Sequence, residues 1–247
     1  MTDRPYPGLR PFTCEESYLF FGREEQTDQL LEKLGEQRFL AVVGLSGCGK
    51  SSLVQAGMIA ALESGYLARA GANWRIATLR PGDHPLINLA RALFQETALQ
   101  PELARVFPAD ALPEETSLPF LLAALRRGPL GLVEILRETP LPPHTNLLIL
   151  ADQFEEIFRY HQADNRREIE AFVALLLASA KQAEIPIYVV ITMRSDFIGD
   201  CARFQELPEM INAGQYLVPR LTRDQQRLAI MRPAEVFWSS VEAGLVN

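Results

Sequence analysis

Apolar and polar residues alternate along the chain in blocks that predict strands and helices in turn. Five short runs of four to seven residues, apolar or alternating and rich in Val, Ile and Leu, predict strands at 38–43, 74–79, 146–151, 187–193 and 215–218. The run Asn146 to Ala151 is apolar on both of its faces. This pattern is typical of an interior strand in a parallel sheet, because helices cover such a sheet on both sides.

Between these runs, apolar residues recur at the spacing of a helix. They predict helices at 24–34, 52–62, 84–98, 118–127, 130–138, 153–160, 166–183, two within 195–212, and 223–231. Strands that alternate with helices predict an α/β fold, with a doubly wound, mostly parallel five-stranded sheet and helices on both faces.

Composition narrows the class of protein. The net charge of −7 and a pI near 5.1 argue against a broad nucleic-acid-binding surface. No apolar run is long enough to span a membrane, and the first residues lack the apolar core of a signal peptide. The three cysteines are scattered without metal-binding spacing, which favours reduced thiols. We therefore expect a cytoplasmic protein.

Residues Gly44 to Ser51 fit the phosphate-binding loop pattern G-x-x-x-x-G-K-[ST]. They lie between a predicted strand and a predicted helix, which is the context that this motif requires. Glycines let the loop wrap so that backbone N–H groups point at a phosphate, while Lys50 supplies a positive charge and the hydroxyl of Ser51 a ligand for Mg²⁺. The alternative is a glycine-rich turn with a surface lysine. We expect the nucleotide to contact Gly44, Ser46, Gly47, Cys48, Gly49, Lys50, Ser51 and Ser52.

The strand that ends at Ala151 is followed by Asp152-Gln153-Phe154-Glu155-Glu156. An aspartate at the carboxyl end of a buried strand, about a hundred residues after the loop, is the expected Walker B position for holding Mg²⁺ with Ser51. Alternatively, Asp152 caps the following helix, and both roles are compatible. Glu155 or Glu156, with a slight preference for Glu156, is expected to polarise the attacking water. The alternative is that both only favour the N-terminus of that helix.

The predicted strand 187–193 ends in Arg194. In P-loop ATPases with an extra strand between the Walker A and Walker B strands, a cationic residue at its tip senses the γ-phosphate, and we expect this role for Arg194. A structural ion pair with Asp152 or Glu156 is the alternative. The GTPase base-reading signature [NT]-K-x-D is absent after the loop, which favours ATP over GTP.

These motifs together resemble the novel STAND NTPases, bacterial signal-transducing P-loop ATPases related to the NACHT and to the apoptotic and plant-resistance ATPases. The resemblance covers nearly the whole chain. It includes the segment 5–12 (Pro-Tyr-Pro-Gly-Leu-Arg-Pro-Phe), Phe20-Phe21-Gly22-Arg23-Glu24, the Asp152 segment, Thr192-Met193-Arg194, and the helical stretch 221–234. It implies that Phe21, Gly22 and Arg23 lie beside the adenine of the nucleotide.

The resemblance also implies a domain plan and a function. We expect an N-terminal arm and adenine-side segment at 1–22, a P-loop core at 23–232, and the start of a truncated C-terminal helical region at 233–247. The implied function is a switch that is closed with ADP, and that opens and self-associates or binds protein partners with ATP before slow hydrolysis resets it. Two alternatives remain open: a ring-forming AAA+ remodelling ATPase, disfavoured by Gln153 where an acidic residue is expected, and a non-hydrolysing, nucleotide-dependent scaffold.

Overall fold

A computed structural model describes residues 4–67, 73–106, 114–159 and 165–238. Its centre is a five-stranded sheet in which every paired strand is parallel, in the order β2-β3-β4-β1-β5. The strands are β1 (Phe39–Gly44), β2 (Asn73–Leu79), β3 (Thr145–Ala151), β4 (Ile187–Arg194) and β5 (Gln215–Leu217). The predicted α/β fold with a five-stranded parallel sheet is confirmed.

Successive residues of each strand point to opposite faces of the sheet, and both faces are buried. In β1, Phe39, Ala41 and Val43 belong to one apolar cluster, whereas Leu40 and Val42 belong to the other. The same alternation holds along β3 and β4. β1, β3 and β4 therefore need apolar residues at nearly every position, which explains why they appear in the sequence as mainly apolar runs, whereas the edge strand β2 also carries Asn73, Arg75 and Thr78.

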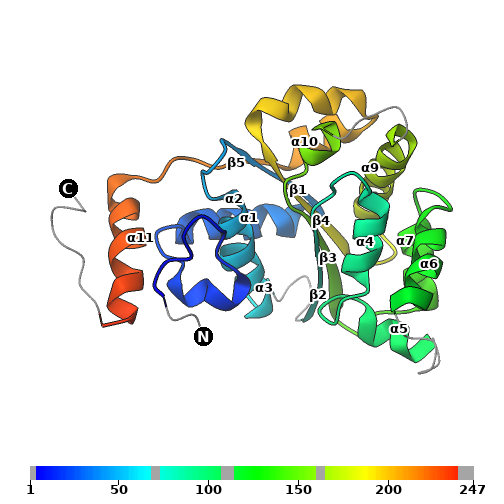
Figure 1. Ribbon diagram of the computed structural model, residues 1–247, viewed down its shortest axis with the longest axis horizontal. Coiled ribbons are helices and arrows are strands. Elements are labelled where there is room, and N and C mark those ends of the chain that lie inside the picture. The colour runs from blue at the N-terminus through cyan, green and yellow to red at the C-terminus, as the bar shows by residue number, and fades with distance from the viewer. Residues whose placement is uncertain (1–3, 68–72, 107–113, 160–164, 239–247) are drawn as a thin grey trace.

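Helices cover the two faces of the sheet unequally (Figure 1). The larger cluster is completed by α4 (Pro85–Leu93), α6 (Glu114–Leu125), α7 (Gly131–Glu138), α9 (Arg166–Lys181) and α10 (Leu207–Gly214). The smaller cluster is completed by α1 (Glu24–Glu36), the π-helical η2 (Leu53–Ile59) and α3 (Ala60–Glu63). The short α2 (Lys50–Ser52) joins β1 to η2, so the phosphate-binding loop is followed directly by helices that pack in the smaller cluster.

Several helices differ from the predicted ranges. The predicted helix 153–160 is only α8 (Glu156–Arg159), because the chain turns at Gln153, whose φ is +59°. The first part of the predicted pair within 195–212 is the 3-10 helix η4 (Ser195–Arg203), and α5 (Gln100–Val106) was not predicted. The predicted helix 84–98 ends already at Leu93, and a short 3-10 helix, η1 (Cys14–Leu19), precedes α1.

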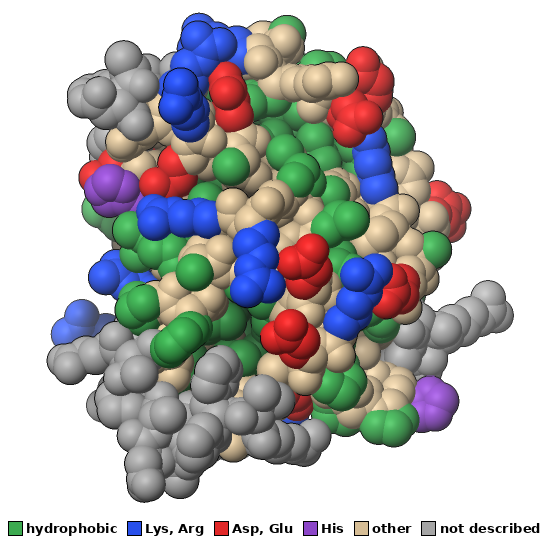
Figure 2. All heavy atoms as spheres, turned by 90° about the vertical axis from the view of Figure 1, so that its right-hand side faces the viewer, with side chains coloured by type: hydrophobic (Ala, Val, Ile, Leu, Met, Phe, Trp, Pro, Cys, Tyr) green, Lys and Arg blue, Asp and Glu red, His purple; other side chains and the backbone are tan. Residues whose placement is uncertain are grey.

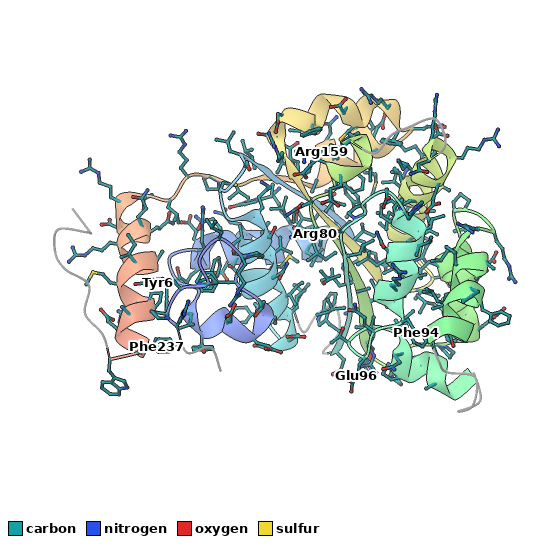
Figure 3. The ribbon with its side chains drawn as sticks, in the orientation of Figure 1. Tyr6, Arg80, Phe94, Glu96, Arg159 and Phe237 are labelled. Atoms are coloured by element: carbon teal, nitrogen blue, oxygen red, sulfur yellow. The ribbon has the colours of Figure 1, made fainter. Side chains whose placement is uncertain are left out.

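The helix α11 (Arg223–Val236) packs against the N-terminal segment and lies far from α4 and α6 (Figure 1). It begins at Thr222, whose side chain accepts a hydrogen bond from the backbone N–H of Gln225, as in a capping box. The hydroxyl of Tyr6 donates to the carbonyl oxygen of Ile230 at 2.5 Å, and Figure 3 shows Tyr6 between the N-terminal segment and α11. The helix runs through residue 232, where we had placed the end of the core.

The face that carries α4 to α7 is shown in Figure 2. Among its described side chains, acidic and basic groups are interspersed with apolar ones, and no large patch of a single charge is visible. Within the described residues, no helix combines the length and the apolar character that crossing a membrane requires.

Candidate nucleotide site

The loop between β1 and α2 depends on glycine for its backbone conformation. Gly47 has a φ of +72° and Gly49 a φ of +89°, values that L-residues rarely adopt. A Cβ atom at either position would meet no heavy atom within 4 Å, so the requirement is conformational and not a lack of space. The loop is therefore shaped as a phosphate-binding loop requires, directly before a helix N-terminus.

The ammonium group of Lys50 lies within this loop. Its Nζ donates hydrogen bonds to the carbonyl oxygens of Gly44 at 3.1 Å and Leu45 at 2.8 Å, and the residue is 9% exposed. The lysine is thus held over the loop by the backbone and not by an acidic side chain. A phosphate group would replace these neutral acceptors with charged ones, which form stronger hydrogen bonds.

Asp152 lies at the carboxyl end of β3, is 2% exposed, and joins three segments of the chain. One of its oxygens, Oδ1, accepts hydrogen bonds from the Ser51 hydroxyl at 2.7 Å and from the Thr192 hydroxyl at 2.6 Å. Thr192 in turn accepts from the backbone N–H of Gln153 at 2.9 Å. β4 lies between β1 and β3, so Thr192 reaches Asp152 from the neighbouring strand.

The oxygens of Ser51 and Asp152 fit a Mg²⁺ site. Mg²⁺ is usually bound by one or two protein oxygens together with phosphate oxygens and water, and not by a cage of protein ligands. The described residues contain no group of three or more His, Cys, Asp or Glu side chains arranged for a metal. A metal at this position would therefore be bound by the oxygens of Ser51 and Asp152 together with phosphate oxygens of the nucleotide.

The two glutamates that follow Asp152 point to different places. Glu155 is 6% exposed, lines the cavity beside the loop, and has Oε2 3.4 Å from the backbone nitrogen of Arg194. Glu156 instead accepts a hydrogen bond at Oε2 from the backbone N–H of Gly82 at 3.0 Å. The expectation that both lie in the first turn of a helix is wrong, because the turn at Gln153 delays the helix until Glu156.

Arg194 ends β4 and lines the same cavity. Its guanidinium donates two hydrogen bonds to Asp196, at 3.0 Å and 2.6 Å, and lies 5.6 Å from the centre of the Phe197 ring. The hydrogen bonds to Asp196 raise the pKa of Arg194, so the side chain is firmly cationic. The alternative ion pair with Asp152 or Glu156 is not formed.

The segment expected beside the adenine lies next to the cavity but does not line it. Arg23 is 6% exposed and donates to the carbonyl oxygens of Cys48 at 3.2 Å and Pro219 at 2.9 Å. Burial lowers the pKa of its guanidinium. Gly22 has a φ of +83°, and a Cβ atom there would clash with the carbonyl oxygen of Gln225. The segment that includes Phe21, Gly22 and Arg23 thus ties the loop to the chain around α11.

The cavity measures about 730 Å³, within the range of small-molecule sites. Of the predicted contact residues of the loop, Ser46, Gly47, Gly49, Lys50, Ser51 and Ser52 line it, whereas Gly44 and Cys48 do not. The rest of the lining is the segment Tyr6 to Phe12, Gln153, Glu155, Arg159, Thr192, Arg194, and Ala229 of α11. The backbone N–H of Phe12 donates to Ser52 Oγ at 3.2 Å, which fixes the N-terminal segment against the loop. The segment Tyr6–Phe12 was not predicted to lie at the site. Its prolines indicate only an irregular segment on the surface of the domain.

Comparisons with known proteins bear on the family and the fold of this chain. The model of the family described as Novel STAND NTPase 1 matches residues 5–247. A search of curated proteins finds no match. The fold is similar to that of the Aeropyrum pernix ORC2 protein, solved in ADPNP–ADP complexes, with a TM-score of 0.55, 14% identity, 94% of this chain covered and 55% of that chain. It is also similar to a Walker-type ATPase of Pyrococcus abyssi, with a TM-score of 0.52, 18% identity, and coverage of 96% and 64%. This chain thus spans less than two thirds of either protein.

Proposed function

This chain belongs to the novel STAND NTPases, and we propose that it is the ATP-binding switch module of a larger signalling protein. It binds ATP with Mg²⁺ and hydrolyses it slowly. The observation that carries this proposal is the 2.7 Å hydrogen bond between Ser51 and Asp152, because it joins the ends of the Walker A and Walker B segments at one point of the cavity.

Each step of hydrolysis has a candidate residue in this chain. Lys50 and the backbone of the loop bind the phosphates, and Ser51 and Asp152 hold Mg²⁺, which neutralises charge on the phosphates. Glu155 orients the attacking water, since it faces the cavity whereas Glu156 is engaged with Gly82. Arg194 binds the γ-phosphate in place of Asp196 and so distinguishes ATP from ADP.

The switch itself involves α11. This helix contributes Ala229 to the cavity wall and contacts the N-terminal segment through Tyr6 and Gly22. A change at the nucleotide therefore has a direct route to the C-terminal part of the chain. Self-association or binding of protein partners upon activation follows from the family and is part of the proposal.

Titration calorimetry with Mg-ATP tests the assignment. Lys50→Ala should raise the Kd at least roughly 100-fold, because a charged phosphate contact is lost from a buried site. The matched control is Lys181→Ala, whose side chain is half exposed and pairs with Glu206 far from the loop. Asp152→Asn should bind ATP equally well with and without Mg²⁺, whereas the parent protein should bind more tightly with Mg²⁺. Equal affinity in the parent and Lys50→Ala would refute the phosphate site.

Turnover separates this proposal from the ring-forming alternative. A switch module should hydrolyse ATP slowly, retain ADP, and show a rate per molecule that does not depend on protein concentration. A rate that rises steeply with self-association would favour the ring-forming ATPase instead. No hydrolysis in a single-turnover assay would favour the scaffold.

A further inference from the structure

A second arginine, Arg159, faces the same cavity as Arg194 but has no role so far. It ends α8, lines the cavity, and comes from a part of the chain 35 residues before Arg194. Figure 3 labels Arg159 on the side of the molecule where η4 and α10 lie. The hydrolysis proposed above assigns no function to this arginine in the cavity wall.

One aromatic ring holds both arginines. The Arg159 guanidinium lies 5.7 Å from the centre of the Phe197 ring, and that of Arg194 lies 5.6 Å from the same centre. Stacking on a ring face holds a guanidinium while leaving its N–H donors free at the edge. Phe197 therefore acts as a platform that brings two cations from different elements together.

A second aromatic contact fixes α8 relative to η4. Phe158, the neighbour of Arg159, stacks on Phe197 with ring centres 5.9 Å apart and an angle of 12° between the planes. Phe158 also contacts Phe154, which is 1% exposed within the core. Arg159 is thus anchored through its neighbour, although it is itself exposed.

The other cations of the cavity wall already have partners. Lys50 is held by loop carbonyls, Arg10 by Glu16, and Arg194 by Asp196. Arg159, in contrast, has no hydrogen bond or ion pair among the described residues, although it lies near enough to Asp196 to help lower the pKa of that carboxyl group. Its N–H donors are available to an anion without loss of an existing contact.

We propose that Arg159 binds the terminal phosphate of the nucleoside triphosphate together with Arg194, as a two-arginine clamp set on Phe197. This inference rests on the proposed function, because it needs a triphosphate in the cavity. Two guanidinium groups match the charged oxygens of the γ-phosphate, the group that ATP has and ADP lacks. Arg159 is then a specificity-determining residue for triphosphate over diphosphate.

The test compares affinities for a non-hydrolysable ATP analogue and for ADP by titration calorimetry. Arg159→Gln should weaken the ATP analogue about tenfold, the loss of one charge-assisted contact, and leave ADP affinity unchanged. Arg159→Lys should restore part of the preference, since it keeps the charge but not the fork of donors. The matched control is Arg203→Gln, an exposed arginine of η4 that pairs with Asp200 and does not line the cavity.

The outcomes distinguish this inference from the proposed function. If the parent protein binds the ATP analogue and Arg159→Gln keeps the parental ratio of the two affinities, the clamp is refuted while the nucleotide site stands. If the parent protein does not bind the ATP analogue, both the clamp and the proposed nucleotide site are refuted. Circular dichroism of each variant shows whether a loss of affinity comes from unfolding, and Arg159→Lys supplies a second test if Arg159→Gln does not fold.

Discussion

At the scale of single residues, the site is organised by buried polar groups that have defined partners. Asp152 receives two hydroxyl groups on one oxygen, and Thr192, which is fully buried, connects it to the backbone of Gln153. A buried carboxylate is costly unless its hydrogen bonds are made, so these contacts fix its orientation. The carboxylate that we propose as a metal ligand therefore has a fixed orientation in the folded chain.

The two neighbouring glutamates should behave differently when neutralised. Glu155→Gln should lower the single-turnover rate of ATP hydrolysis at least roughly 100-fold while ATP affinity stays unchanged, because orienting the water matters in the transition state. Glu156→Gln should hydrolyse ATP at the parental rate and lose about 1 kcal/mol of unfolding free energy, as the Gly82 N–H loses a charged acceptor. If only Glu156→Gln lowers the rate, Glu156 orients the attacking water. If both variants hydrolyse ATP at the parental rate, neither glutamate does, and another residue must act as the base.

The sequence predicted these residues unevenly. The loop Gly44 to Ser51 could be identified because its residues act together within eight consecutive positions. The slight preference for Glu156 over Glu155 had no firm basis in the local pattern, because their directions depend on the left-handed conformation of Gln153 and on Gly82 of a distant loop. Arg159 was missed because its position depends on Phe197, which is 38 residues away.

At the scale of elements, α11 and the N-terminal segment meet at a glycine. A Cβ atom on Gly22 would clash with the carbonyl oxygen of Gln225, so the two backbones approach more closely than a side chain would permit. The same segment carries Arg23, whose hydrogen bonds reach the phosphate-binding loop and the chain before α11. The segment that carries Gly22 and Arg23 thus lies between the loop and the chain around α11, and contacts backbone groups of both.

Two glycines with nearly the same backbone conformation allow this contact to be measured. Gly22 has a φ of +83° and Gly65 a φ of +85°, but a Cβ atom on Gly65 would meet no heavy atom within 4 Å. Gly65→Ala should cost about 1 kcal/mol of unfolding free energy from the left-handed conformation alone. Gly22→Ala should cost about 2 kcal/mol more, from overpacking against α11. Urea denaturation measures both, and equal losses would contradict a close contact.

Apolar residues at helical spacing predict that a helix is present, but not always which type of helix it is. The range 118–127 predicted a helix that is present as α6, because its apolar residues face the core at helical spacing. The range 195–212 also has apolar residues at helical spacing, yet its first part is 3-10 helical. Phe197 and Phe204 pack on Phe158 of α8, and this tertiary packing accompanies the tighter helix, which the sequence pattern does not reveal.

At the scale of the whole molecule, an ion pair between Arg10 and Glu16 of η1 fixes the conformation of the N-terminal segment itself. Arg10 donates two hydrogen bonds to Glu16, at 2.6 Å and 2.5 Å, and Glu16 is 5% exposed. The hydrogen bonds from Arg10 lower the pKa of Glu16 from 4.5 to about 2. Because the pKa is lower in the folded chain, this carboxylate stabilises the fold above about pH 4.5 and loses that effect as the pH falls through about 2.

The parent protein and Glu16→Gln should therefore differ in stability in a pH-dependent way. At pH 7 the variant should be less stable by about 1 kcal/mol, a modest value because half of Arg10 is exposed. The difference should shrink between pH 4.5 and pH 2, as measured by urea denaturation at several pH values. Glu184→Gln, which removes a half-exposed partner of Arg137, is the control and should leave the denaturation midpoint unchanged. A difference that stays constant with pH would contradict the pairing.

The class of fold followed from the sequence, whereas the arrangement of the strands did not. Five apolar or alternating runs separated by helices predict a parallel sheet, because strands that alternate with helices form such sheets and the run 146–151 is apolar on both faces. The order β2-β3-β4-β1-β5 depends on contacts between residues far apart, such as Gly44 beside Arg194. Composition and spacing within one run carry no information on which other run it will pair with.

That strand order has a consequence for synthesis of the protein on the ribosome. β1 is the first strand to be made, but both of its partners, β4 and β5, come from the last third of the chain. About 170 residues separate β1 from the end of β5, which corresponds to roughly 10–30 s of translation. For most of that time, until β4 has been made, the apolar strand Phe39–Gly44 has neither of its neighbours, and its free edges are open to association with other chains. The strand that leads into the proposed phosphate-binding loop thus needs protection while the polypeptide is incomplete.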